Sequence, residues 1–258
     1  DNTLRLMSCS HGGSHKHKIP LKIGGQGHLI EDSWFYGVGR YVVQCFNGNN
    51  MTIRRNVMRW DATIANEPSE PNAAMSNYSC NDMIWENNIS LDYGVPETPM
   101  SHCGDMCMST IVDQPNLRVR YLGNMVINHD PATDNNIALR ADQKGALPST
   151  DITVTDFYIR AVRTGIAVNP LYQNFIVSKC TTIDVENDGQ IGSSGGGLIT
   201  CGDDADISVR YVEGVKTSEA LFPFAHQALI KRDLCESGER QSDWCLTGKN
   251  LGDYVLDL

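Results

Sequence analysis

A short pattern of apolar and polar positions recurs along residues 1–215. An apolar residue is followed by two variable positions, a small or polar residue, one variable position and usually a second apolar residue. The clear copies are Ile30–Phe35, Ile53–Met58, Ile84–Ile89 and Tyr121–Val126. The shorter or weaker copies are Leu6–Cys9, Val154–Asp156, Val177–Cys180 and Val209–Val212. The small or polar position falls at residues 9, 33, 56, 87, 124, about 156, 180 and 212, with spacings of about 23 to 37 residues.

An Asn or Asp stands just before most of these copies, which indicates a sharp corner repeated once per copy. Both residue types tolerate left-handed backbone and can bond to their own turn. Gln26 fills this position ahead of the second copy. The other residues at the position are Asn2, Asn50, Asp82, Asn116, Asp151, Asn174 and Asp206.

Further short apolar runs follow several copies and predict additional strands. They are Ile19–Ile23, Tyr41–Cys45, Asn136–Leu139, Gly165–Val168 and Gly197–Cys201. Short strands separated by Asn and Gly corners favour a solenoid over a sandwich, because a sandwich has no reason to repeat the same corner. No stretch shows a long helical period. The sequence therefore predicts an all-β fold: a single-stranded right-handed parallel β-helix of about eight coils with long loops, about 40 Å in length.

The repeated pattern resembles the right-handed parallel β-helix repeat proteins, the broad group around pectate lyases, polygalacturonases and alginate or chondroitin lyases. The resemblance covers residues 1–215 and is specific for the fold. It does not select one activity, because one fold hosts many chemistries. Residues 216–258 change in character and are predicted to form a last coil, a cap or a docking segment.

The beginning of the chain bears on assembly, because a solenoid exposes an unpaired coil at each end. Asn2 already occupies the corner position, so no capping helix precedes the first coil in this sequence. Two explanations stay open. The chain is a piece of a longer protein, or copies of the chain stack end to end and cover the open coil.

The charge and the hydropathy of the chain exclude two classes of partner. The net charge of −10 and the pI of about 5.1 give an acidic surface that repels the phosphate backbone of nucleic acids. No apolar run approaches the roughly 20 residues that a membrane-spanning helix requires. A polysaccharide stays a candidate partner.

Nine cysteines are a high number for a chain of 258 residues, and most stand singly rather than in zinc-binding pairs. This pattern predicts disulfides in an oxidising compartment and therefore a secreted or cell-surface protein. Cys235 and Cys245 flank a polar loop that a disulfide could close, and Cys80 is expected to pair with Cys103 or Cys107. Cys9 and Cys180 are expected to be small buried core residues.

A cluster of basic residues provides the candidate site for a polysaccharide lyase. The resemblance implies a cation that neutralises a uronate carboxylate and a Lys or Arg base, for which Arg54, Arg55 and Arg59 are candidates. Asp32, Arg55 and Glu86 are predicted to stack on three successive coils, about 5 Å apart. This stack is either a substrate-binding face or a surface salt ladder, and we favour the ladder. Residues expected to contact a substrate are Arg40, Trp85 and Glu86.

Acidic clusters offer oxygen ligands for calcium, and Asp203, Asp204 and Asp206 form the first candidate. No cluster has the spacing of an EF-hand loop, and acidic turns are common on acidic solenoids. The motifs that the resemblance implies for a polygalacturonase are missing, which counts against glycoside hydrolysis. No other cofactor is predicted.

Three functions therefore stay open from the sequence. The first is a non-catalytic extracellular structural or surface solenoid, which the missing catalytic motifs and the disulfides favour, and which could assemble end to end into a filament. The second is a secreted polysaccharide lyase or another carbohydrate-active enzyme. The third is a carbohydrate-binding or adhesion module without catalysis.

Overall fold

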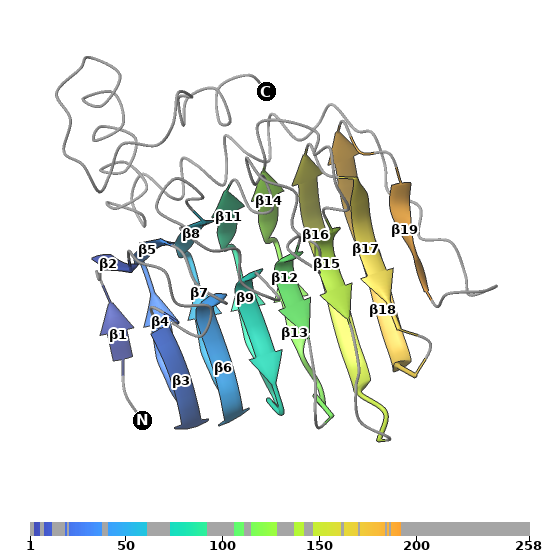
Figure 1. Cartoon of the computed structure of the whole chain (residues 1–258). Coiled ribbons are helices and arrows are strands. Elements are labelled where there is room, and N and C mark those ends of the chain that lie inside the picture. The colour runs from blue at the N-terminus through green and yellow to red at the C-terminus, as the bar shows by residue number, and fades with distance from the viewer. Residues whose placement is uncertain are drawn as a thin grey trace, which may run out of the picture.

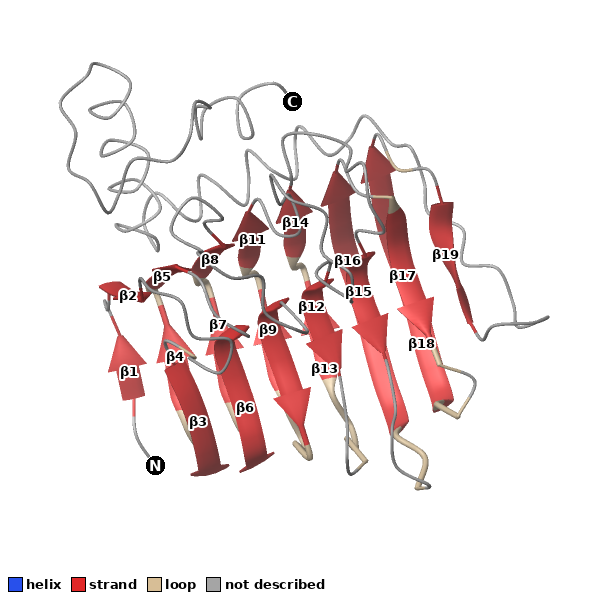
Figure 2. Ribbon diagram, viewed as in Figure 1, coloured by secondary structure: helices blue, strands red, loops and turns tan. Residues whose placement is uncertain are grey.

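The computed structural model describes most of the chain up to residue 191. The described residues are 3–5, 8–11, 19, 21–37, 41–60, 73–91, 106–110, 115–127, 137–141, 147–160, 163–169, 171–183, 185 and 187–191. These residues form strands and a few turns. No helix is found among them, and hence none of the length and hydropathy that crossing a membrane requires (Figure 2).

The strands follow one another in groups of three, each of which we call a repeat. The first strands of the first five repeats are β1 (Thr3–Arg5), β4 (Leu29–Glu31), β7 (Thr52–Arg54), β10 (Ile84–Glu86) and β13 (Arg120–Leu122). The second strands are β2 (Ser8–His11), β5 (Trp34–Gly37), β8 (Val57–Trp60), β11 (Ile89–Leu91) and β14 (Met125–Ile127). In the sixth and seventh repeats, one long strand takes both places: β16 (Thr150–Arg160) and β18 (Gln173–Ile183). The third strands are β3 (Leu21–Gln26), β6 (Tyr41–Asn49), β9 (Ala73–Tyr78), β12 (Met106–Thr110), β15 (Ile137–Ala141), β17 (Thr164–Val168) and β19 (Asn187–Ile191).

Each strand pairs in parallel with the equivalent strand of the neighbouring repeat, so equivalent strands lie side by side along the molecule (Figure 1). The third strands make a 7-stranded sheet, and the first and second strands make a 12-stranded sheet in which β16 joins both rows. The predicted all-β, parallel character of the fold is confirmed. The right hand and the closure of the sheets into a solenoid stay predictions.

One row of side chains from the first strands forms part of the core. Ile30, Ile53, Trp85, Tyr121 and Val154 occupy aligned positions, and at most 1% of each residue is exposed. The predicted register is wrong by one residue in the fourth repeat, where Trp85 points inward instead of Ile84. The reason is packing, because the large indole fills the core while Ile84 pairs with Thr52 and Arg120 and stays partly exposed.

The same shift moves the polar position of that repeat from Asn87 to Asn88. Asn88 is fully buried, whereas Asn87 is exposed and has a φ of 52°. Asn56, Asn88 and Asn124 form a continuous buried row that we call the asparagine ladder. The backbone N–H of Asn56 donates to Asn88 Oδ1 over 3.1 Å, and that of Asn88 donates to Asn124 Oδ1 over 2.9 Å.

The ladder also satisfies backbone carbonyls at the bend between the first and second strands. Nδ2 of Asn56, Asn88 and Asn124 donates to the carbonyl of Ile30, Ile53 and Trp85, respectively. A buried backbone group without a partner costs about 1–3 kcal/mol, so each amide removes a penalty that the bend would otherwise create. The asparagines therefore hold the bend from inside.

A row of left-handed residues precedes the first strands, as the corner prediction required. Asn50, Asp82, Asp151 and Asn174 have φ values between 51° and 61°. Two of the predicted corner residues are wrong. Gly27, with a φ of 72°, takes the position instead of Gln26, and Arg118, with a φ of 56°, takes it instead of Asn116. Asn116 lies inside, where its Oδ1 accepts from the backbone N–H of Cys80 over 2.7 Å.

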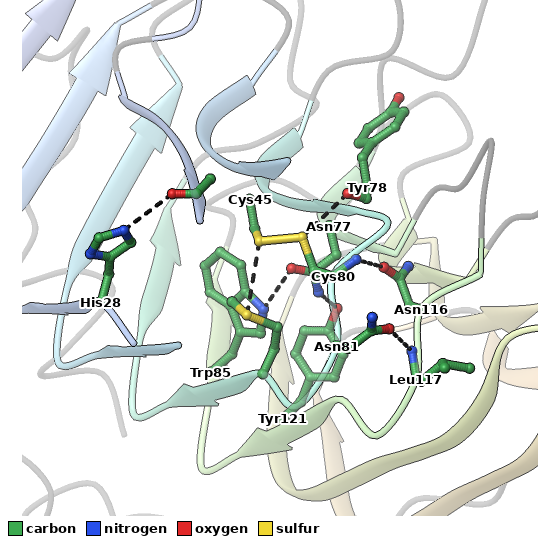
Figure 3. Close-up of a disulfide and its surroundings, with 12 residues drawn as sticks. His28, Cys45, Asn77, Tyr78, Cys80, Asn81, Trp85, Asn116, Leu117 and Tyr121 are labelled. Carbon is green, nitrogen blue, oxygen red and sulfur yellow. Dashed lines mark hydrogen bonds between the residues drawn. A yellow bond between two sulfur atoms is a disulfide. The ribbon is translucent and has the colours of Figure 1, made fainter. Parts of the chain in front are cut away.

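A disulfide joins Cys45 of β6 to Cys80, which lies just after β9, with 6.5 Å between the Cα atoms (Figure 3). Both cysteines are fully buried, and Cys45 Sγ lies 3.8 Å from Met83 Sδ. The expected pairing of Cys80 with Cys103 or Cys107 is wrong, because stacking of the repeats places Cys80 beside Cys45 of the preceding repeat. Cys180 is buried as predicted, but it is disulfide-bonded rather than a simple core thiol.

The last predicted coil around Val209–Val212, the segment 216–258 and the pair Cys235 and Cys245 lie outside the described residues. Cys103, Arg40 and the acidic cluster of Asp203, Asp204 and Asp206 lie outside them as well.

Candidate functional site

An exposed line of polar side chains runs across five repeats where the chain enters the first strands. We call Asn50, Asp82, Arg118, Asp151 and Asn174 the corner row. Backbone bonds fix their spacing, since the N–H groups of Asn50, Asp82 and Arg118 donate to carbonyls of the next repeat over 2.9 to 3.0 Å. The rigid backbone therefore presents these side chains at about the 4.8 Å spacing of neighbouring strands.

Two adjoining surface cavities follow the corner row. The first, of about 590 Å³, is lined by Asn47, Asn49, Asn81 and Leu117 among others. The second, of about 510 Å³, is lined by Asn50, Ile84, Arg120, Asp151 and Thr153. Asp82 and Arg118 line both cavities, and we call the two adjoining cavities together the groove.

A two-pronged ion pair lies at the middle of this groove. Arg118 Nε donates to Asp82 Oδ1 over 2.6 Å, and an Arg118 terminal nitrogen donates to Oδ2 over 2.8 Å. The hydrogen bond from Arg118 lowers the pKa of Asp82, and the same bond raises the pKa of Arg118. Both groups stay charged at neutral pH, so neither is poised to exchange a proton with a substrate.

Further polar groups lie in the groove and, in the case of Asn174, on the repeat next to Asp151. Asn174 Nδ2 donates to Asp151 Oδ1, and the exposed Arg120 has no ion pair among the described residues. Amides, carboxylates and a guanidinium on a fixed backbone can donate to and accept from a ligand rich in hydroxyl groups. The groove therefore has the chemistry of a binding surface.

The basic residues singled out from the sequence are engaged elsewhere. Arg54 contacts Glu31 over 2.7 Å, and Arg55 contacts both Glu31 and Asp32 over 2.7 Å. The hydrogen bond that Arg55 donates to Asp32 raises the pKa of Arg55, so the guanidinium stays protonated and is less available as a base. This network pairs Asp32 with Arg55 across neighbouring repeats, as the ladder interpretation requires, but the carboxylates of Glu31 and Asp32 are buried rather than on the surface. Glu86 is not stacked on Arg55 as predicted, because it aligns with Arg54, and Asn87 takes the position beside Arg55.

Two further candidates remain: Trp85, expected to contact a substrate, and Arg59, a candidate base. Trp85 is fully buried and its Nε1 donates to Asn77 Oδ1 over 3.0 Å, so its predicted contact with substrate is wrong (Figure 3). Arg59 belongs to β8, but its side chain is outside the described part. Within the described ranges, no three His, Cys, Asp or Glu side chains gather as metal ligands do.

Arg118 was not predicted as a site residue, because the corner pattern in the sequence rests on Asn and Asp. A signal was available in the charge alternation of Asp82, Arg118 and Asp151 at one position of successive repeats. This charge alternation is visible only when the register of the repeats is known. Asn116 lies two residues before Arg118 and fits the pattern of one Asn or Asp at each corner.

No protein-family model matches the chain, and no curated protein or solved structure matches it either.

Proposed function

We propose that the chain is a right-handed parallel β-helix that serves as a rigid, exported surface solenoid. The observation that carries the proposal is the asparagine ladder, which runs in register through the same stack as the core disulfide. Both features stiffen the backbone from inside and leave the outer face free to vary. A regular stack of this kind suits a structural or adhesive rod.

The cysteines support the location. Cys45 and Cys80 form a buried disulfide, and Cys180 is bonded as well. Structural disulfides form and persist mainly in oxidising compartments. We therefore infer a secreted or cell-surface protein.

We propose end-to-end stacking as the mode of assembly, and sheet edges among the described strands support it. Among the described strands, β1, β2 and β3 pair on one side only, and so do β18 and β19. Unpaired edges are templates for another chain, and here a second copy would continue the ladders. Electron microscopy of the purified protein tests this. Filaments with an axial repeat of about 40 Å are expected, and discrete single particles at high concentration would contradict assembly.

The groove along the corner row favours a second candidate, carbohydrate binding without catalysis. A polysaccharide could follow the row, with its hydroxyl groups bonded to Asp82, Arg118 and Asp151. Binding to an array of acidic and neutral polysaccharides tests this proposal. We expect Arg118→Asn to weaken binding at least about tenfold, because one ionic hydrogen-bonding group is worth about 1.5–3 kcal/mol.

Lys179→Asn is the matched control for that test. Lys179 is also an exposed cation at a left-handed position, with a φ of 52°, but it lies outside the groove. Equal losses of binding affinity in both variants would assign the effect to the change in net charge rather than to the groove. A new absorbance at 235 nm on incubation with an acidic polysaccharide would instead favour the polysaccharide lyase.

A further inference from the structure

Three asparagines of the chain stand in the acceptor pattern for N-linked glycosylation, Asn-X-Ser/Thr. They are Asn50 with Thr52, Asn77 with Ser79 and Asn88 with Ser90, and none has proline between the two residues. In a protein that passes through a glycosylating secretory compartment, each such asparagine is a substrate for oligosaccharide transfer. The three asparagines differ in whether their side chains are buried or exposed.

Asn77 and Asn88 have no room for a sugar. Both are fully buried, and both use the Nδ2 atom that would carry the glycan. Asn77 Nδ2 donates to Tyr121 Oη over 2.9 Å (Figure 3). Asn88 Nδ2 donates to the carbonyl of Ile53 over 2.9 Å and to Asn124 Oδ1 over 3.0 Å. A glycan on either nitrogen would have to pass through the packed core.

Asn50 is in the opposite situation. Its side chain is exposed at the corner, where its left-handed backbone has a φ of 51°, and its backbone N–H already bonds to Asn81 O. No hydrogen bond of its side-chain amide is found within the described part of the chain. It lines the open cavity of about 510 Å³ beside Asp82 and Arg118, so a sugar on Nδ2 would project into solvent.

We propose that Asn50 is the acceptor site for an N-linked oligosaccharide, and that the native fold is incompatible with glycans on Asn77 and Asn88. The donor is a lipid-linked oligosaccharide diphosphate. Asn50 Nδ2 attacks the anomeric carbon of the first sugar, the bond from that carbon to the diphosphate oxygen breaks, and Nδ2 loses one proton. The lipid diphosphate leaves with the electron pair of the broken bond.

The proposal rests on export but does not depend on filament formation or on carbohydrate binding. A glycan on Asn50 would lie over the ion pair of Asp82 and Arg118 and cover part of the groove. The glycosylated and the unmodified chain would therefore present different surfaces at the corner row.

The test is secretion of the full chain from a glycosylating eukaryotic host, followed by mass spectrometry of each site. Thr52→Val removes the Asn50 acceptor pattern and keeps a β-branched residue in β7. Ser79→Gly with Ser90→Ala removes the other two patterns and leaves both buried amides intact. Ser79 has a φ of 56°, which glycine accepts, and Ser90 Oγ is buried with no hydrogen bond to the described residues, so both changes are mild.

We expect folded, protease-resistant protein to carry a glycan on Asn50 alone, and Thr52→Val to lose it completely. If transfer to Asn77 or Asn88 precedes folding, the wild type is retained in the cell, and the double variant restores secretion with Asn50 occupied. Folded protein with a glycan on Asn77 or Asn88 would overturn the proposal. Secretion of the double variant with Asn50 unmodified would overturn it as well. Material from a non-glycosylating host provides the reference for the fold.

Discussion

The asparagine ladder and the corner row are two polar lines that cross the same repeats, and they differ in almost every physical respect. The ladder residues Asn56, Asn88 and Asn124 are fully buried, and their amides bond to each other and to carbonyls at the bend. In the corner row, Asn50, Arg118, Asp151 and Asn174 are exposed, and the side-chain bonds of Arg118 to Asp82 and of Asn174 to Asp151 lie at the surface. The same residue type at the same period thus stabilises the fold in one place and is available to a ligand or a glycan in the other.

The strongest test of the interior is removal of the Cys45–Cys80 disulfide. The bond closes a sequence separation of 35 residues, and a loop of this length is expected to stabilise the fold by about 4 kcal/mol. Cys45→Ala with Cys80→Ala should lower the free energy of unfolding in urea by about that amount. Repeating the measurement on the variant with reductant separates the contribution of the remaining disulfides. A loss under about 1 kcal/mol would show that the bond does not hold the two repeats together.

A direct comparison of the two environments comes from neighbouring asparagines. Asn88→Ala removes the acceptor for Asn56 and the donor to the Ile53 carbonyl, both buried, and should cost about 3 kcal/mol. Asn87→Gly changes the exposed neighbour at a left-handed position and should cost less than about 1 kcal/mol. Urea denaturation measures both, and similar losses would remove the distinction between ladder and surface.

The smallest effect is expected at the Asp82–Arg118 pair of the corner row. The hydrogen bond from Arg118 lowers the pKa of Asp82 below its ordinary value of 3.8. The stabilisation is therefore complete above that value and is lost as the pH falls through the lowered pKa of the folded state. Because the side chains are 40% and 54% exposed, solvent screens the pair.

Asp82→Asn should accordingly flatten the decline of the thermal midpoint between about pH 5 and 2, by less than about 3 °C. Asp151→Asn, in the same row, is the control for a general change in charge. An equal flattening in the control would assign the effect to net charge rather than to the ion pair.

The sequence was sufficient for the strands, their parallel arrangement and most of the corners, because an inward apolar residue and a left-handed residue recur once per repeat. It failed where two residues could fill one role. Ile84 and Trp85 are both apolar, and Asn87 and Asn88 are identical, so the register in that repeat depends on which side chain fits the core.

The candidate site was less accessible to sequence reasoning. Arg118 takes a left-handed position that arginine seldom adopts, and a search by residue preference passes over it. The partner of Cys80 was missed because β6 and β9 become neighbours only when the repeats stack. In both cases the deciding information is a contact between residues more than 30 positions apart.

The pairing of each strand with neighbouring repeats alone has a consequence for how the chain reaches its structure. Contacts across the first strands join residues 23 to 36 positions apart, and this interval does not grow as repeats are added. The entropy of closing each new loop therefore stays nearly constant. Folding can nucleate at one place and spread repeat by repeat.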